Sequence, residues 1–316
     1  MKFLSKNHFF YPSLLVLELI IFFAGKAISP FEISYSFFVS AGALILTVLT
    51  VEKMVREIYK TPHSDIRVIL LMFLFLSPIF QLNLFLSYNK FLSIFFLLFA
   101  FLNYLLFEKE FKRTCLLFSF LSIIFSTYFY SYAFVAALPL LIFIIIKARW
   151  KGMIYFMILI VLLYLVFTSD YVSLTHLSSW NISNWFRSGF DLTSYNSINI
   201  IFAFFPVLHP IIFIAGILVL PFIRFSDFEE PVLKISAISF IIYSLFIAGF
   251  PFQHFSTLII TFPALIIILF PAILRVIHLT EYFRPKFIKT LPYFVFILQI
   301  ALLSFFLLSD EHIYFK

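Results

Sequence analysis

Charged residues, glycine and cysteine are all scarce in this sequence of 316 residues. Only 12% of the residues are charged and six are glycine, whereas 63% are hydrophobic and the mean hydropathy is +1.10. A soluble domain carries about a quarter charged residues, and folding alone cannot hide so much apolar surface from water. The composition therefore argues against a water-soluble globular protein and predicts one that lipid covers over most of its surface.

Other absences exclude several kinds of site. The single cysteine, Cys115, leaves no disulfide framework and no thiol-rich metal site. The sequence contains no P-loop, GxGxxG, CxxC or HExxH pattern, so no metal ligands are predicted. The net charge of +7 would suit nucleic acid, but the charges form short clusters between apolar runs, so no nucleic-acid partner is expected. The first apolar run has no small-residue cleavage site, so we expect no cleavable signal peptide.

Long apolar runs predict an all-α, polytopic transmembrane bundle of about eleven spans, with a range of nine to twelve. A single integral membrane domain over residues 1–316 is expected. The runs lie at 11–28, 33–51, 67–86, 91–107, 115–129, 132–147, 152–168, 198–223, 232–249, 257–275 and 291–309. Residues 115–147 are the ambiguous part. An aromatic, hydroxyl-rich stretch at 127–132 either joins two short helices or lies within one long tilted helix.

The basic residues decide between these two interpretations. With eleven spans and a cytoplasmic N-terminus, 18 of the 22 Lys and Arg residues fall inside and four fall outside, namely Lys26, Lys90, Arg187 and Lys316. This is a strong positive-inside bias, which a single helix over 115–147 would destroy. The sequence thus predicts two short helices there and a cytoplasmic N-terminus. Because no eukaryotic retention signal is evident, we expect the cytoplasmic membrane of a prokaryote.

This topology gathers polar residues on the outer face. The sizeable external segment, 169–197, contains Trp180 and Trp185 and is predicted to lie at the lipid headgroups. The polar residues at this face are Glu32, Asn83, Asn89, Lys90, Asp170, Arg187, Asp191, Gln253 and His254. His209 stands apart in a span broken by Pro206 and Pro210. It either lines a cavity or is a hydrogen-bonded structural residue of a kinked helix.

Several stretches carry a resemblance to a known class. Residues 77–90 read SPIFQLNLFLSYNK and precede an aromatic helix, residues 115–147 form a two-part run with a short outer join, and residues 247–266 read IAGFPFQHFSTLIITFPALI. On these stretches and on 199–216, with its His209-Pro210, the chain resembles the GT-C class of polytopic membrane glycosyltransferases. The resemblance is to polyprenyl-phosphate-sugar-dependent, mannosyltransferase-like members. The first stretch is similar to their "sP…s…s.D" hairpin, and the last to a late helix reading "l..l.P.l.ll".

The resemblance implies an outward-facing site for a polyprenyl-phosphate-linked sugar donor in the membrane. A carboxylate takes the proton of the acceptor in such a reaction, and cations hold the leaving phosphate. The acid of the class stands in a long first external loop, which is truncated here to about 29–32 with Glu32 as its one carboxylate. Asp170 and Asp191 are the alternative acids. The residues left to bind substrate or phosphate are Asn89, Lys90, Arg187, His209, Gln253 and His254.

Departures from the class keep the function open. Asn89-Lys90 stands where an Asp is common, and 253–256 lacks the expected Arg, which leaves His254 as the phosphate contact there. The chain is thus either a GT-C-like glycosyltransferase, a degenerate member or a distinct subfamily. Two alternatives remain. The first is a transporter or polymerase of envelope glycolipid or polysaccharide, and the second is a non-catalytic accessory membrane subunit. No cofactor is identified, and a divalent cation is kept open as one.

Overall fold

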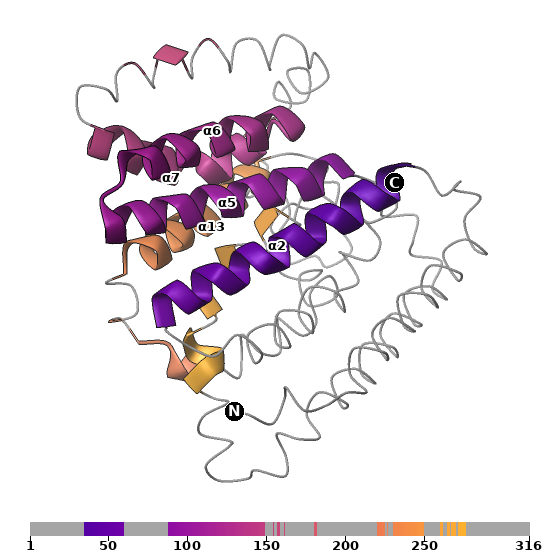
Figure 1. The fold of residues 1–316 in the computed structure, drawn as a ribbon. Helices are drawn as coiled ribbons and strands as arrows, with labels where there is room; N and C mark the ends of the chain where they lie inside the picture. Colours follow the sequence, from indigo (N-terminus) through magenta and orange to yellow (C-terminus); the bar gives the residue numbers. More distant parts are fainter. Residues whose placement is uncertain are drawn as a thin grey trace, which may run out of the picture.

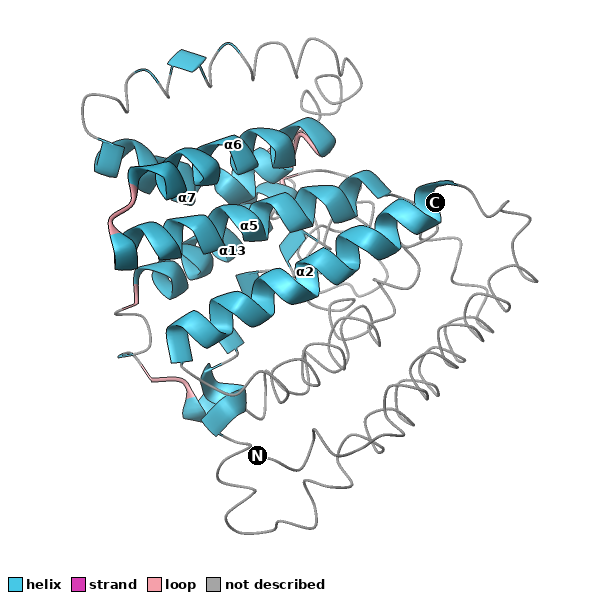
Figure 2. Ribbon diagram, in the orientation of Figure 1, coloured by secondary structure: helices cyan, strands magenta, loops and turns pink. Residues whose placement is uncertain are grey.

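The computed structural model describes residues 35–59, 88–148, 154, 157–158, 161, 180–181, 220–224, 226, 230–249, 260–261, 264–265, 267–269 and 271–275. In chain order its elements are α2 (Tyr35–Tyr59), α5 (Tyr88–Glu110), α6 (Arg113–Phe129), α7 (Ala133–Ala148), the 3₁₀ turn η4 (Leu220–Phe222) and α13 (Pro231–Ala248). These residues contain no strand, so the predicted all-α class is confirmed for the part of the chain that the structure describes (Figure 2).

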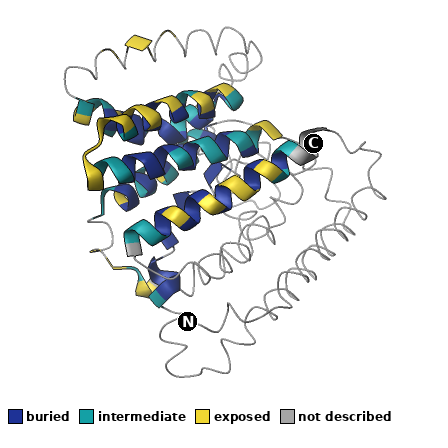
Figure 3. Cartoon of the chain, viewed as in Figure 1, coloured by how far each residue is buried: buried dark blue, intermediate teal, exposed yellow. Residues whose placement is uncertain are grey.

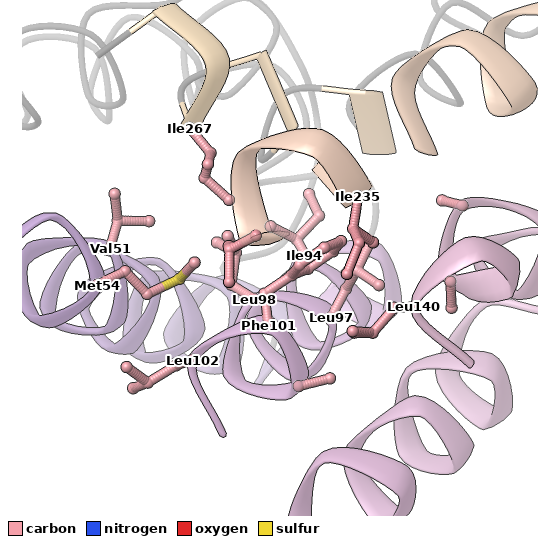
Figure 4. Close-up of a cluster of buried hydrophobic side chains, with 14 of the residues drawn as sticks. Val51, Met54, Ile94, Leu97, Leu98, Phe101, Leu102, Leu140, Ile235 and Ile267 are labelled. Atoms are coloured by element: carbon pink, nitrogen blue, oxygen red, sulfur yellow. The ribbon is translucent and has the colours of Figure 1, made fainter. Parts of the chain in front are cut away.

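Helix α5 lies at the centre of the described helices and packs against α2, α6, α7 and α13 (Figure 1). Its 23 residues include no glycine or proline that would interrupt the helix. Residues 100–105 are all buried, and a helix hides every side only when neighbours surround it. The core around α5 takes Val51 and Met54 from α2, Leu140 from α7 and Ile235 from α13 (Figure 4).

Ion pairs show that α2, α5 and α7 run in the same direction. Lys109 Nζ of α5 lies 3.8 Å from Glu57 Oε2 of α2, and Lys147 Nζ of α7 lies 3.0 Å from Glu108 Oε1 of α5. All three helices therefore end at the same side of the bundle, which we call the charged end. We call the opposite side the tyrosine end, defined by Lys90 and residues 128–132 and 243–249.

Residues 115–147 form two antiparallel helices, α6 and α7, as the basic residues predicted. The chain leaves α6 at Tyr130, which has an extended backbone and donates its N–H to Ser126 O at 3.1 Å. It enters α7 within three residues, with Ala133 N donating to Tyr130 O at 2.9 Å. The alternative of one long tilted helix is wrong.

Helices α5 and α6 are joined by a seam of buried hydroxyl groups. Ser93 Oγ donates to Ser126 O at 2.9 Å, Ser126 Oγ donates to Ser93 O at 2.9 Å, and the two hydroxyls lie 3.0 Å apart. Further along, Ser119 Oγ donates to Ala100 O at 2.7 Å. Small side chains let two helix backbones approach closely, and their hydroxyls can then bond across the interface.

The observed helices extend beyond some of the apolar runs. The apolar run 33–51 predicted a span that ends at residue 51. Helix α2 continues to Tyr59 through Glu52, Lys53 and Arg56. Glu, Lys and Arg all favour helix, so the helix need not stop where hydrophobicity does. The apolar run 198–223 predicted a transmembrane helix to residue 223. The structure instead has a 3₁₀ turn at 220–222, which contains Pro221. Arg275 Nη1 bonds Phe222 O there at 2.6 Å.

Large apolar side chains are exposed on α2 and α6, whereas several hydroxyl groups of the same helices are buried. Figure 3 shows exposed residues along both helices. On α6 the buried face carries hydroxyls, whereas the exposed face carries Leu117, Phe118, Leu121, Phe125 and Tyr128. On α2 the buried polar residues are Ser40, Thr47, Thr50 and Glu52, and the exposed ones include Ile45, Leu46 and Leu49. Rows of exposed large apolar residues are unusual on a soluble protein.

Among the described helices, α5 alone is both long and apolar enough to cross a membrane, while α6, α7 and α13 are apolar but shorter. At a rise of 1.5 Å per residue α5 spans about 34 Å, close to the thickness of a hydrocarbon core. Several other hydroxyls inside these helices bond the backbone of their own helix. Thr47, for example, donates to Ala43 O at 2.8 Å and Thr127 to Ile123 O at 2.9 Å.

Candidate functional site at the tyrosine end

Lys90 is a predicted site residue whose side chain lies against an aromatic ring in the structure. It lies in the first turn of α5, and its ammonium sits 5.7 Å from the ring centroid of Tyr130. A cation at this distance from an aromatic face is attracted by the ring quadrupole. The Tyr130 ring in turn meets Tyr132 edge-on, with centroids 5.6 Å apart. The turn between α6 and α7 therefore holds the lysine over the Tyr130 ring, which itself packs on Tyr132.

Two tyrosine hydroxyls meet beneath this lysine. Tyr243 of α13 is almost fully buried, and its hydroxyl interacts with that of Tyr130. The Tyr130 hydroxyl is inaccessible to solvent. The two phenols thus form a polar contact between the α6–α7 turn and α13, inside an otherwise apolar bundle.

Residues 180–181 cover the end of α13. Trp180 Nε1 donates to Phe246 O at 2.9 Å, and Asn181 N donates to Gly249 O at 2.8 Å. Phe246 O also accepts the Gly249 N–H at 3.1 Å, so the indole adds a second bond there, whereas Asn181 supplies a partner to the carbonyl of the C-cap residue Gly249. Phe246 also meets Tyr132, with ring centroids 6.0 Å apart. A part of the predicted external segment therefore lies beside the tyrosines.

This arrangement suits recognition of an anion. Lys90 supplies the positive charge, and an ammonium group binds anionic oxygens through charge-assisted hydrogen bonds. The five acidic residues that the structure describes lie in the halves of α2 and α5 nearest the charged end, or just before α13. Within the described residues no group of three or more His, Cys, Asp or Glu could hold a metal ion. An anion at the tyrosine end would therefore meet no described carboxylate.

Two of the predicted site residues fall within the described part of the chain. Asn89 is exposed in the first turn of α5, beside Lys90. The predicted acids Glu32, Asp170 and Asp191 lie outside the described residues, and so do Arg187, His209, Gln253 and His254. Whether these seven residues join Lys90 at one site stays a prediction.

The sequence analysis missed Tyr132, Tyr243 and Gly249 as members of this site. The stretch 127–132 predicted a position at the membrane–water interface. That Tyr130 lies under Lys90 depends on the sharp turn of the chain at Tyr130. Tyr243 is the one tyrosine of α13, and it faces Tyr130 because of its position around the helix axis. Gly249 reads as part of an ordinary turn in Ala248-Gly249-Phe250-Pro251.

Comparison with models of protein families, with curated proteins and with solved structures gives no match.

Proposed function

We propose that the chain is a polytopic protein of about eleven spans in the cytoplasmic membrane of a prokaryote, with its N-terminus inside. The large apolar side chains exposed on the described helices are the main support. Large apolar residues face outward on α2, α6, α7 and α13, while serines, threonines and Glu52 face inward. Water would make this arrangement costly, whereas a hydrocarbon environment favours it because polar groups then avoid the lipid.

The directions of the helices support the same topology. Helices α2 and α5 are parallel, which requires an odd number of crossings between them, and the span predicted at 67–86 would supply one. Helices α7 and α13 are antiparallel, which fits the two spans predicted between them. Both 67–86 and most of 149–230 lie outside the described residues. The clusters of basic residues at the charged end fit a cytoplasmic side.

Aromatic side chains also mark two levels that fit the edges of a membrane. Tyr128 is 67% exposed near the tyrosine end, and Phe111 is 76% exposed near the charged end. Phe111 lies just before α6, which begins at Arg113, and the helical rise from Arg113 to Tyr128 is about 22 Å, most of the depth of a hydrocarbon core. Exposed aromatic rings at both levels are typical of the membrane–water interfaces.

Chemical labelling of introduced cysteines tests this orientation. In a Cys115→Ser background, Tyr128→Cys should react with a membrane-impermeant thiol reagent added outside intact cells. Thr114→Cys, exposed at the opposite end of the same helix, should react only after the membrane is permeabilised. The reverse pattern would overturn the proposed orientation, and equal labelling of both from outside would overturn the membrane-spanning position of α6.

For the reaction, we propose GT-C-like transfer of a sugar from a polyprenyl-phosphate donor on the outer side. The observation that supports it is Lys90, the described cation at the tyrosine end, held over Tyr130 at a membrane edge. In the reaction an acceptor hydroxyl forms a bond to the anomeric carbon, the bond from that carbon to the phosphate oxygen breaks, and the lipid phosphate leaves. Lys90 would stabilise the charge on the phosphate.

A general base is also required, because the attacking hydroxyl must lose its proton. Glu32, Asp170 and Asp191 are the proposed acids for this role. Membranes containing the protein should move radiolabelled mannose from polyprenyl phosphomannose into product, and Glu32→Gln, Asp170→Asn or Asp191→Asn should abolish the transfer. Glu230→Gln, at the start of α13, is the control and should transfer normally. Normal transfer by all three acid variants would remove these residues as bases.

A further inference from the structure

Residues 180–181 dock on the end of α13 through two backbone carbonyls. The Trp180 indole bonds Phe246 O, and the Asn181 N–H bonds Gly249 O. Both acceptors lie at the C-terminal end of α13, where Phe246 O also accepts the Gly249 N–H and Gly249 is the C-cap residue. The contact joins positions that are 66 residues apart in the chain. It thus fixes part of the segment between the predicted spans against a helix end.

Gly249 makes this docking possible because it has no side chain. Its φ of −76° lies in the ordinary right-handed region, so the backbone conformation does not call for glycine. The requirement is one of space, since a Cβ at this position would overlap the Trp180 indole. Glycine is the residue that allows such a close approach of ring and backbone.

The docked indole is connected to Lys90 by a series of contacts. Trp180 bonds Phe246, the Phe246 ring meets Tyr132, Tyr132 meets Tyr130, and Tyr130 lies under the lysine ammonium. Each aromatic contact in the series has centroids 6.0 Å apart or less, and the ammonium lies 5.7 Å from the last ring. Packed aromatic rings at these distances restrict one another's orientation.

We propose that Trp180 and Gly249 are positioning residues for Lys90. This inference rests on the proposed function only in that Lys90 is taken to bind a phosphate. When Trp180 is docked, it fixes the end of α13 and with it Phe246, Tyr132 and Tyr130. When it is displaced, the ring under Lys90 is free to turn, and the ammonium loses the orientation that suits a phosphate oxygen.

A double-mutant cycle tests this role, with dodecyl phosphate as the probe and the full chain in lipid nanodiscs. Gly249→Ala should weaken binding about tenfold by displacing the indole, and Trp180→Leu should weaken it by a similar factor, near the upper value for a single hydrogen bond. In the Trp180→Leu background, Gly249→Ala should have no further effect, because its damage passes through the indole. Gly42→Ala, whose Cβ would meet nothing within 4 Å, is the matched control and should bind normally.

Losses that multiply in the double variant would overturn the inference, since Gly249 would then act independently of Trp180. The docking itself is tested without any ligand. In a Cys115→Ser background, the pair Trp180→Cys and Gly249→Cys should form a disulfide, and failure to do so would also overturn the inference. If the disulfide forms but the wild-type protein does not bind dodecyl phosphate, the proposed phosphate site is wrong while the docked contact stands.

Discussion

Replacing Lys90 by methionine should weaken the binding of dodecyl phosphate by about 10- to 100-fold, the value of a hydrogen bond to a charged group. Methionine keeps the length and the apolar stem, so the packing on Tyr130 is disturbed little while the charge is lost. Binding is measured with the protein in lipid nanodiscs at fixed ionic strength. Sugar transfer from polyprenyl phosphomannose should fall with it.

Lys90→Arg separates the charge from the shape of the group. Arginine keeps the positive charge and stacks well on aromatic rings, so the affinity should fall much less than in Lys90→Met. Lys234→Met removes an exposed lysine near the start of α13, at the other end of the bundle, and should bind as the wild-type protein does. If Lys90→Met binds as tightly as the wild type, Lys90 is a structural residue and the proposed phosphate site is wrong.

The sequence was sufficient to predict the helical class and the division of residues 115–147. Apolar runs locate helices, and the excess of Lys and Arg on one side makes two helices consistent where one would not be. The predicted runs 91–107 and 232–249 correspond to α5 (Tyr88–Glu110) and α13 (Pro231–Ala248) within a few residues. These features depend on local composition, which a sequence displays directly.

The contacts of the candidate site could not be predicted in the same way. Lys90 was identified by its place at the end of a span, but its position over Tyr130 depends on how α5 and the α6–α7 turn pack. Tyr243 faces Tyr130 because of the rotation of α13 about its axis. In a uniformly apolar helix, hydrophobic periodicity gives little information about that rotation. The role of Gly249 depends on Trp180, which is 69 residues earlier in the chain.

The serine seam between α5 and α6 shows the same dependence on helix rotation. Ser93 and Ser126 read as ordinary polar interruptions of apolar runs, yet both are fully buried and bond one another's backbone across the interface. Helix α6 turns Ser119 and Ser126 toward α5, whereas large apolar residues such as Leu117 and Phe118 are exposed, which is a pattern that a lipid environment favours. The close approach of α5 and α6 therefore depends on small residues at positions 93 and 126.

Replacing Ser126 by leucine should destabilise the protein by about 3 kcal/mol, through overpacking of a closed interface and the loss of its hydrogen bonds. Leucine is larger than the space that lets Ser126 Oγ reach Ser93 O at 2.9 Å, so α6 would have to move away from α5. Ser126→Ala, which only removes the hydroxyl, should cost about 1 kcal/mol. The measurement is reversible unfolding of the protein in mixed micelles.

Thr114→Leu is the matched control for this series, because Thr114 is an exposed polar residue at the start of the same helix. Its change to leucine should alter the free energy of unfolding by less than about 0.5 kcal/mol, as expected for a surface position. Equal effects of leucine at 114 and at 126 would mean that α5 and α6 do not meet at Ser93 and Ser126. A large effect at 126 alone supports a seam whose close contact holds the α6–α7 turn, and with it Tyr130, against the lysine of α5.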